Sequence, residues 1–76
     1  MLVNKGDLLV RKHEGNTATP YEVILADDEY FCVGEIVYDE AVGETILSFM
    51  DVQIYSNDES IGCLKEYGFE KAEMEE

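Results

Sequence analysis

The side chains that could act as a nucleophile, base or metal ligand are few and far apart in this sequence. His13 is the only histidine of the 76-residue chain and stands between Lys12 and Glu14 in a polar stretch. Nucleophilic chemistry would require Cys32 or Cys63 to meet His13, but both cysteines lie among apolar residues typical of a core. We therefore expect a solvated histidine and buried reduced thiols, with a disulfide or a metal site as the alternative.

Neighbouring acids are the other candidates for chemistry. Asp27, Asp28 and Glu29 are consecutive, and Asp39 and Glu40 form a second group. Such groups could hold a hard cation or work as an acid/base pair. Neither lies in the D-x-D-x-D-G pattern of a calcium loop, and the chain has no glycine-rich phosphate loop. We expect no metal, no cofactor and no enzymatic activity.

Acidic residues dominate the charge of the chain. It has 18 acids and five bases, a formal net charge of −13, while 46% of its residues are hydrophobic, enough for a folded core. Between His13 and Leu64 there is no Lys or Arg, and the acids there are Glu14, Glu22, Asp27, Asp28, Glu29, Glu35, Asp39, Glu40, Glu44, Asp51, Asp58 and Glu59. Such a charge repels nucleic acid and anionic membranes and attracts basic surfaces.

Seven of these acids form our candidate partner-binding site: Asp27, Asp28, Glu29, Glu35, Asp39, Glu40 and Glu44. We expect the twelve acids of residues 13–64 to form one continuous negative face or rim, with the groups at 27–29 and at 39, 40 and 44 each projecting from a hairpin turn. The expected partner is a basic nucleic-acid-binding protein, with no direct binding to nucleic acid or membrane. No signal-peptide pattern or run of about 18 apolar residues is present, so we expect a cytoplasmic protein.

The elements that position these acids are predicted to be five short β-strands. Strands are predicted over residues 7–12, 21–26, 30–38, 44–50 and 52–56, with a long loop ending at Pro20. Residues 30–38 are apolar on both faces, which is typical of a central strand, and Gly34 within them predicts a bulge or bend. The predicted core contains Leu8, Val10, Val23, Leu25, Phe31, Val33, Ile36, Ile46, Phe49, Ile54 and Leu64.

A change of period marks the C-terminal region. Ser56 and Glu59 have the spacing of a capping box, and apolar residues recur every third position up to Tyr67. Gly68 stands where a left-handed residue would end a helix. We therefore predict a helix from about residue 57 to 67, one domain over residues 1–69 and an acidic disordered tail over residues 70–76.

Five short strands, a long first loop and a final helical turn resemble small SH3-like barrels. The opening "KGDLLVRK" is similar to the first strand of KOW-type SH3-like modules, including small phage proteins. The resemblance covers residues 5–55 and implies a mainly β, five-stranded antiparallel barrel. The basic and aromatic nucleic-acid surface of many KOW-like modules is missing, so fold analogy does not supply the function.

The charge density favours one function over the others. A folded body of this length is about 30 Å across, and duplex DNA of that length carries about 18 phosphate charges. We expect a small non-enzymatic inhibitor that mimics nucleic-acid charge and blocks a basic groove. This strategy resembles that of phage-encoded DNA mimics, among them anti-restriction, anti-CRISPR and uracil-glycosylase-inhibitor proteins.

A second class of function remains open. The chain could be an SH3-like adaptor, assembly module or polymerase regulator that binds through an apolar surface. Exposed Tyr30, Tyr38 and Tyr55, or a sheet edge, would then form the interface, and the acids would provide solubility. Salt separates the two classes, because carboxylate contacts weaken with ionic strength and apolar burial does not.

Overall fold

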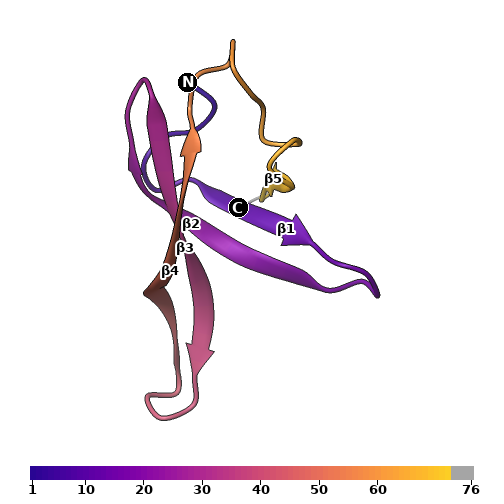
Figure 1. The fold of residues 1–76 in the computed structure, drawn as a ribbon. Coiled ribbons are helices and arrows are strands. Elements are labelled where there is room, and N and C mark those ends of the chain that lie inside the picture. The colour runs from indigo at the N-terminus through magenta and orange to yellow at the C-terminus, as the bar shows by residue number, and fades with distance from the viewer. Residues whose placement is uncertain (73–76) are drawn as a thin grey trace.

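Five strands form one antiparallel sheet in a computed structural model that describes residues 1–72 (Figure 1). The strands are β1 (Leu8–Lys12), β2 (Ala18–Ala26), β3 (Tyr30–Asp39), β4 (Glu44–Ser56) and β5 (Phe69–Lys71). They are ordered β4-β3-β2-β1-β5 across the sheet. The mainly β, five-stranded antiparallel prediction is confirmed. A closed barrel is not, because in the described sheet β4 and β5 are the two edges and do not pair with each other.

The strands differ from the prediction in three places. β2 begins at Ala18, inside the loop that was predicted to end at Pro20. The predicted strands over 44–50 and 52–56 are one strand, β4, and the fifth strand comes instead from residues 69–71. Four residues of β4, 49–52, stand opposite Gly34 alone, so the irregularity expected at this glycine is confirmed. β5 contains Glu70 and Lys71 of the predicted disordered tail, and the N–H of Ala72 donates to the carbonyl of Leu8 at 2.9 Å. Residues 73–76 of that tail lie outside the described residues.

The predicted helix over 57–67 is wrong, because this segment is a succession of turns. Ser56 belongs to β4, and its hydroxyl accepts the N–H of Asp58 at 3.3 Å, so the capping box does not form. Gly62 lies against the hydroxyl of Tyr67, which would overlap any Cβ placed there. The predicted left-handed conformation of Gly68 is confirmed, with φ of 83°.

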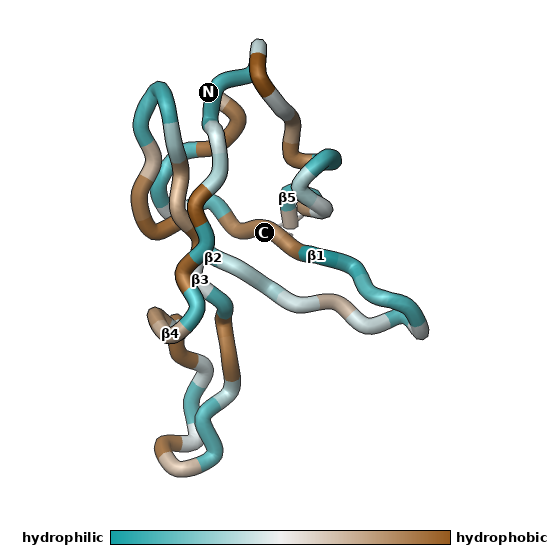
Figure 2. The backbone as a smooth tube through the Cα atoms, in the orientation of Figure 1, coloured by the Kyte–Doolittle hydropathy of each residue, from teal (hydrophilic) through white to brown (hydrophobic). Residues whose placement is uncertain are grey.

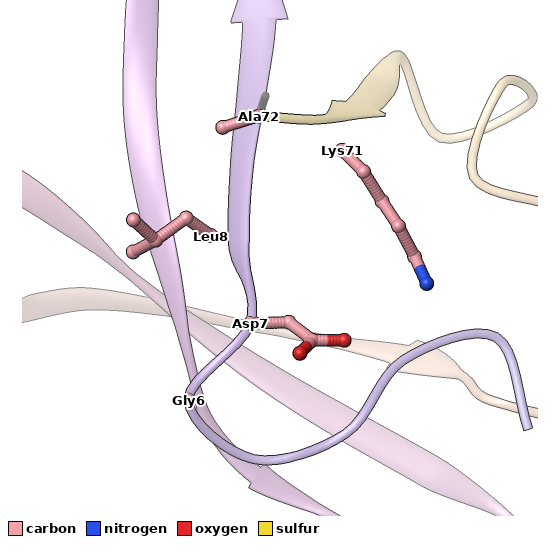
Figure 3. Close-up of a pocket in the computed structure, with 5 residues that line it drawn as sticks. All are labelled: Gly6, Asp7, Leu8, Lys71 and Ala72. Carbon is pink, nitrogen blue, oxygen red and sulfur yellow. The ribbon is translucent and has the colours of Figure 1, made fainter. Parts of the chain in front are cut away.

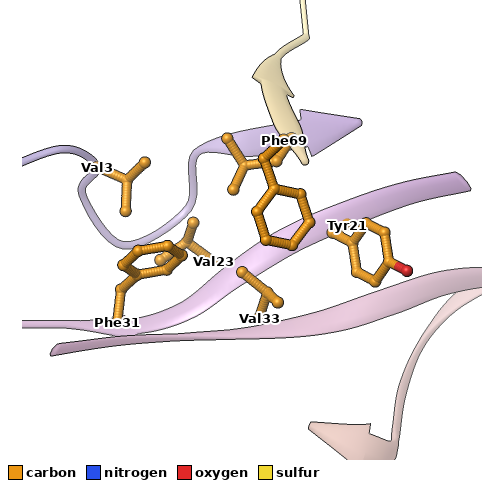
Figure 4. Close-up of a cluster of buried hydrophobic side chains, with 7 residues drawn as sticks. Val3, Tyr21, Val23, Phe31, Val33 and Phe69 are labelled. Carbon is orange, nitrogen blue, oxygen red and sulfur yellow. The ribbon is translucent and has the colours of Figure 1, made fainter. Parts of the chain in front are cut away.

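A core of seven buried side chains fills the concave side of the sheet (Figure 4). Its members are Val3, Leu9, Tyr21, Val23, Phe31, Val33 and Phe69, so only Val23, Phe31 and Val33 of the predicted core are confirmed as buried. On β1 the prediction assigned the wrong face of the strand to the core. Leu9 pairs with Tyr21 and points inward, while Leu8 and Val10 are half-buried.

Several residues predicted in the core are exposed. A bulge in β2 between Val23 and Leu25 reverses the alternation, so Leu25 pairs with Cys32 on the outer face. On β4, Ile54 is the other partner of Cys32 and is also exposed, as are Ile46 and Phe49. Alternation alone could not reveal the outward position of Leu25, because a bulge inverts the face of every residue after it.

Asn57 connects the N-terminus to the sheet. Its side chain is fully buried, and its Oδ1 accepts the N–H groups of Leu2 and Val3 at 2.9 and 3.0 Å. Its Nδ2 donates to the carbonyls of Val3 and Asp27 at 3.1 and 2.9 Å. One side chain therefore fixes three segments that are far apart in sequence: the N-terminus, the β2–β3 turn and the end of β4.

Candidate partner-binding surface

The outward side chains of β3 form an uncharged line along the outer face of the sheet. Phe31 and Val33 are fully buried, so the alternate positions of the strand point away from the core. These positions are Tyr30, Cys32, Gly34, Ile36 and Tyr38. The two tyrosines at the ends are 55% and 65% exposed. The prediction that residues 30–38 form a central strand with two apolar faces is confirmed.

Neighbouring strands widen this line into an apolar surface. Leu25 on β2 and Ile54 on β4 are the lateral partners of Cys32, and they are 59% and 66% exposed. Leu47 pairs with Ile36 in the same way. Figure 2 shows hydrophobic segments on the strands that carry these residues. We call the set of Tyr30, Cys32, Ile36, Tyr38, Leu25, Leu47 and Ile54 the outer stripe.

The structure places the predicted acidic residues at the two ends of the outer stripe. Asp27, Asp28 and Glu29 form the turn between β2 and β3, and Asp39, Glu40 and Glu44 surround the turn between β3 and β4. These turns lie at opposite ends of β3 (Figure 1). With about 3.3 Å per residue, the ten-residue strand separates them by about 30 Å. The acids thus form two clusters with apolar surface between them.

Glu35 is not brought into either cluster. It alternates with the outward residues of β3, pairs with Tyr21 and Ser48, and is half-buried. Its carboxylate therefore belongs to the opposite face of the strand from the outer stripe. Of the seven predicted site residues, six lie at the two ends and one lies elsewhere.

Two of the clustered acids shape their own turns. Oδ1 of Asp27 accepts the N–H groups of Glu29 and Tyr30, both at 2.8 Å, and Oδ1 of Asp39 accepts the N–H of Ala41 at 2.9 Å. The hydrogen bonds from Tyr30 and Glu29 hold the pKa of Asp27 below its ordinary value of 3.8, because they stabilise the charged form. Asp27 and Asp39 therefore have a local structural role in addition to their charge.

The other four clustered acids, Asp28, Glu29, Glu40 and Glu44, are free to meet a partner. All four are exposed. Within residues 1–72 their carboxylates take part in none of the ion pairs, which join the N-terminus to Glu59 and Lys12 to Glu70. They are the strongest candidates for contacts with a cationic surface.

A pocket lies where the outer stripe meets the first acidic cluster. It has a volume of about 440 Å³ and is lined by Glu29, Tyr30, Ser56, Asp58 and Ile61. The hydroxyl and N–H of Ser60 hydrogen-bond Asp58 and hold the pKa of that carboxyl below its ordinary value. The sequence did not predict this pocket, because residues 57–67, which include Ile61, were expected to form a helix.

A second depression, of about 240 Å³, is lined by Gly6, Asp7, Leu8, Lys71 and Ala72 (Figure 3). The carboxylate of Asp7 accepts the N–H of Asn4 at 3.0 Å, so it serves the turn that precedes β1. Lys71 is the other charged side chain of the lining. One acid and one base without a nucleophile give this depression no evident catalytic chemistry.

The remaining reactive side chains are dispersed. Nε2 of His13 hydrogen-bonds the hydroxyl of Thr19 at 2.7 Å in the exposed β1–β2 hairpin. Both thiols are free, as expected, but Cys63 is exposed and Cys32 only half-buried, so the prediction of buried thiols is wrong for Cys63. In residues 1–72, no group of three or more His, Cys, Asp or Glu side chains could hold a metal ion.

Comparisons with known proteins add no family to this description. No family model, curated protein or solved structure was found to match the chain. The part of the chain that the structure describes contains no helix long and apolar enough to cross a membrane.

Proposed function

We propose that this chain is a non-enzymatic binding protein that docks onto a basic surface of another protein through the outer stripe and the acidic clusters at its ends. One observation carries the proposal: exposed apolar surface on β3 ends at both sides in carboxylates that form no ion pair within residues 1–72. An apolar centre with a polar rim is the usual anatomy of a protein–protein interface. The absence of Lys and Arg from residues 13–64 makes a basic partner the complementary one.

We further propose that the basic surface is a nucleic-acid-binding groove and that binding inhibits its owner. The two acidic clusters are about 30 Å apart, close to the helical repeat of duplex DNA, about 34 Å. Carboxylates at this separation would meet cations that otherwise hold phosphates one turn apart. The apolar stripe between the clusters would supply contacts that DNA does not make.

The proposal is tested by capturing a partner and measuring whether salt and duplex DNA displace it. The protein is used to capture a partner from a bacterial lysate at low salt, and the partner is eluted with a salt gradient and identified by mass spectrometry. We expect a basic nucleic-acid-binding protein that elutes as salt rises and that duplex DNA displaces. A partner whose retention is insensitive to both salt and DNA would overturn the proposal.

Charge reversal then locates the contact. Glu40→Lys/Glu44→Lys replaces two free carboxylates at one end, whereas Asp39 is kept because it holds the turn. We expect slower association and a large loss of affinity. The matched control, Glu14→Lys/Glu66→Lys, makes the same change in net charge in the β1–β2 loop and in the turn before β5, and should bind nearly as the parent does. An equal loss of affinity in the two variants would show that only the overall charge matters.

A second function, that of an adaptor or assembly module, is favoured by the edge strand β4. Phe49 and Met50 lie in its irregular stretch and are 65% and 94% exposed. An interface centred on them would be apolar and would persist at high salt. A Phe49→Ser/Met50→Ser variant that loses the partner while Glu40→Lys/Glu44→Lys keeps it would select this function.

A further inference from the structure

The pocket at the end of the outer stripe has walls that are fixed before any ligand arrives. The N–H of Asn57 donates to the carbonyl of Glu29 at 2.9 Å, which joins the two segments that form the pocket. The buried amide of Asn57 also holds the carbonyl of Asp27, so the β2–β3 turn cannot move independently of the end of β4. A preformed site loses less conformational entropy when it binds.

Apolar side chains line this pocket on two sides. Tyr30 and Ile61 are 55% and 71% exposed, so residues 1–72 leave both side chains largely uncovered. Tyr30 is also the first residue of the outer stripe, so the pocket is continuous with the proposed interface. Exposed apolar surface of this kind favours a ligand with an apolar stem.

The charged side chains that line the pocket have one sign, although the N-terminal ammonium, which pairs with Glu59, is close enough to act on Asp58. Glu29 and Asp58 contribute carboxylates, and no Lys or Arg is among the residues that line it. The hydroxyl and N–H of Ser60 stabilise the charged form of Asp58 and hold the pKa of that carboxyl below its ordinary value. The complementary ligand is therefore a cation at the end of an apolar stem.

We propose that this pocket receives an arginine side chain of the basic partner. A guanidinium can stack on the Tyr30 ring while its planar edge donates hydrogen bonds to carboxylates. A lysine ammonium is a point charge without a planar face and would use the aromatic wall less well. This assignment rests on the proposed function, because it names the group by which the partner would be anchored.

The direct test uses a small probe and the whole protein. N-acetyl-arginine methylamide is titrated in the millimolar range and followed by amide chemical shifts, with the citrulline and lysine analogues as matched probes. We expect shifts at Glu29, Tyr30, Asp58 and Ile61 with arginine, weaker shifts with lysine and none with neutral citrulline. Equal responses to citrulline or lysine, shifts centred on another surface, or no response to arginine would overturn the assignment.

Variants connect the pocket to the partner. Glu29→Gln/Tyr30→Ala removes one carboxylate and the aromatic wall, and should weaken arginine binding and partner binding by about tenfold or more. The control Glu14→Gln/Val52→Ala removes one exposed carboxylate and one exposed apolar side chain outside the outer stripe and its acidic clusters, and should leave arginine binding unaffected. Backbone amide spectra confirm that both variants remain folded.

The outcomes separate this inference from the proposed function. If Glu40→Lys/Glu44→Lys loses the partner while Glu29→Gln/Tyr30→Ala keeps full affinity, the pocket assignment is wrong and the proposed surface stands. If the arginine probe binds but partner binding is insensitive to Glu40→Lys/Glu44→Lys, the pocket stands and the wider charged surface fails.

Discussion

The guanidinium of Arg11 on β1 donates a hydrogen bond to the hydroxyl of Tyr55 on β4, with 2.8 Å between Nη2 and the oxygen. Two strands separate these residues in the sheet, so the bond crosses its concave side. Arg11 also donates to the carbonyl of Tyr67 at 2.9 Å and lies over the ring of Phe69, 4.3 Å from its centroid. Side chains thus connect the two ends of a sheet whose edge strands do not pair.

Loss of the Arg11 contacts should loosen this connection. We expect Arg11→Met to lower the free energy of unfolding by about 2 kcal/mol, because it removes hydrogen bonds from a half-buried charged donor. Arg11→Lys should recover only part of this, since lysine lacks the planar fork. Denaturant unfolding is the measurement, and exposed Lys12→Met, within about 0.5 kcal/mol of the parent, is the control. Equal effects at both positions would contradict the assigned role of Arg11.

Asn57 should be among the least replaceable residues. Asn57→Ala removes four hydrogen bonds, although the N–H of Leu2 keeps a second acceptor, the main-chain carbonyl of residue 57 at 3.2 Å, and we expect the substitution to cost about 3 kcal/mol or more. The exposed Asn4 provides the matched control, and Asn4→Ala should stay within about 0.5 kcal/mol. Comparable midpoints of thermal unfolding for the two variants would refute this prediction.

The substitution Gly62→Ala should change the stability in opposite directions in the predicted helix and in the observed turns. In a helix, Gly62→Ala would raise stability by up to about 1 kcal/mol. In this structure the new Cβ would overlap the Tyr67 hydroxyl, so we expect a loss of about 1 to 3 kcal/mol. Adding Tyr67→Phe to Gly62→Ala should restore part of the stability, relative to Tyr67→Phe alone. Stabilisation by Gly62→Ala would favour the predicted helix instead.

The lowered pKa of Asp27 makes part of the stability depend on pH. Because the pKa in the folded state lies below the ordinary value of 3.8, the contribution is fully present above that value and is lost as pH falls through the folded pKa. The Asp27→Asn variant keeps an acceptor but cannot titrate, so its stability relative to the parent should rise as pH falls through this range. Asp28→Asn is the control, because it changes the net charge equally but removes neither of these two hydrogen bonds.

The two thiols should differ in reactivity. Cys63 is exposed and Cys32 is half-buried on β3, so a thiol reagent should modify one group rapidly and the other slowly. Cys63→Ser should remove the rapid phase and leave the slow one. Two rapid phases of thiol modification, or none, would contradict the described exposures of Cys32 and Cys63.

The sequence by itself determined the strand content and the charge. Alternation identified β1, β2 and β3 and the two-sided apolar character of β3, because these features depend on residues next to each other in the chain. It also placed the acids of the candidate site at the two turns that flank β3. The left-handed Gly68 followed from the same local reasoning, even though the helix before it was wrong.

Only the tertiary structure decided which faces are buried and where the charges meet. The bulge beside Ile24 and the four residues opposite Gly34 invert or interrupt the alternation, which turns predicted core residues outward. The turns after β4 replace a helix because Asn57 is bound to distant backbone and Gly62 is packed against Tyr67. These contacts join residues remote in sequence, so no local pattern records them.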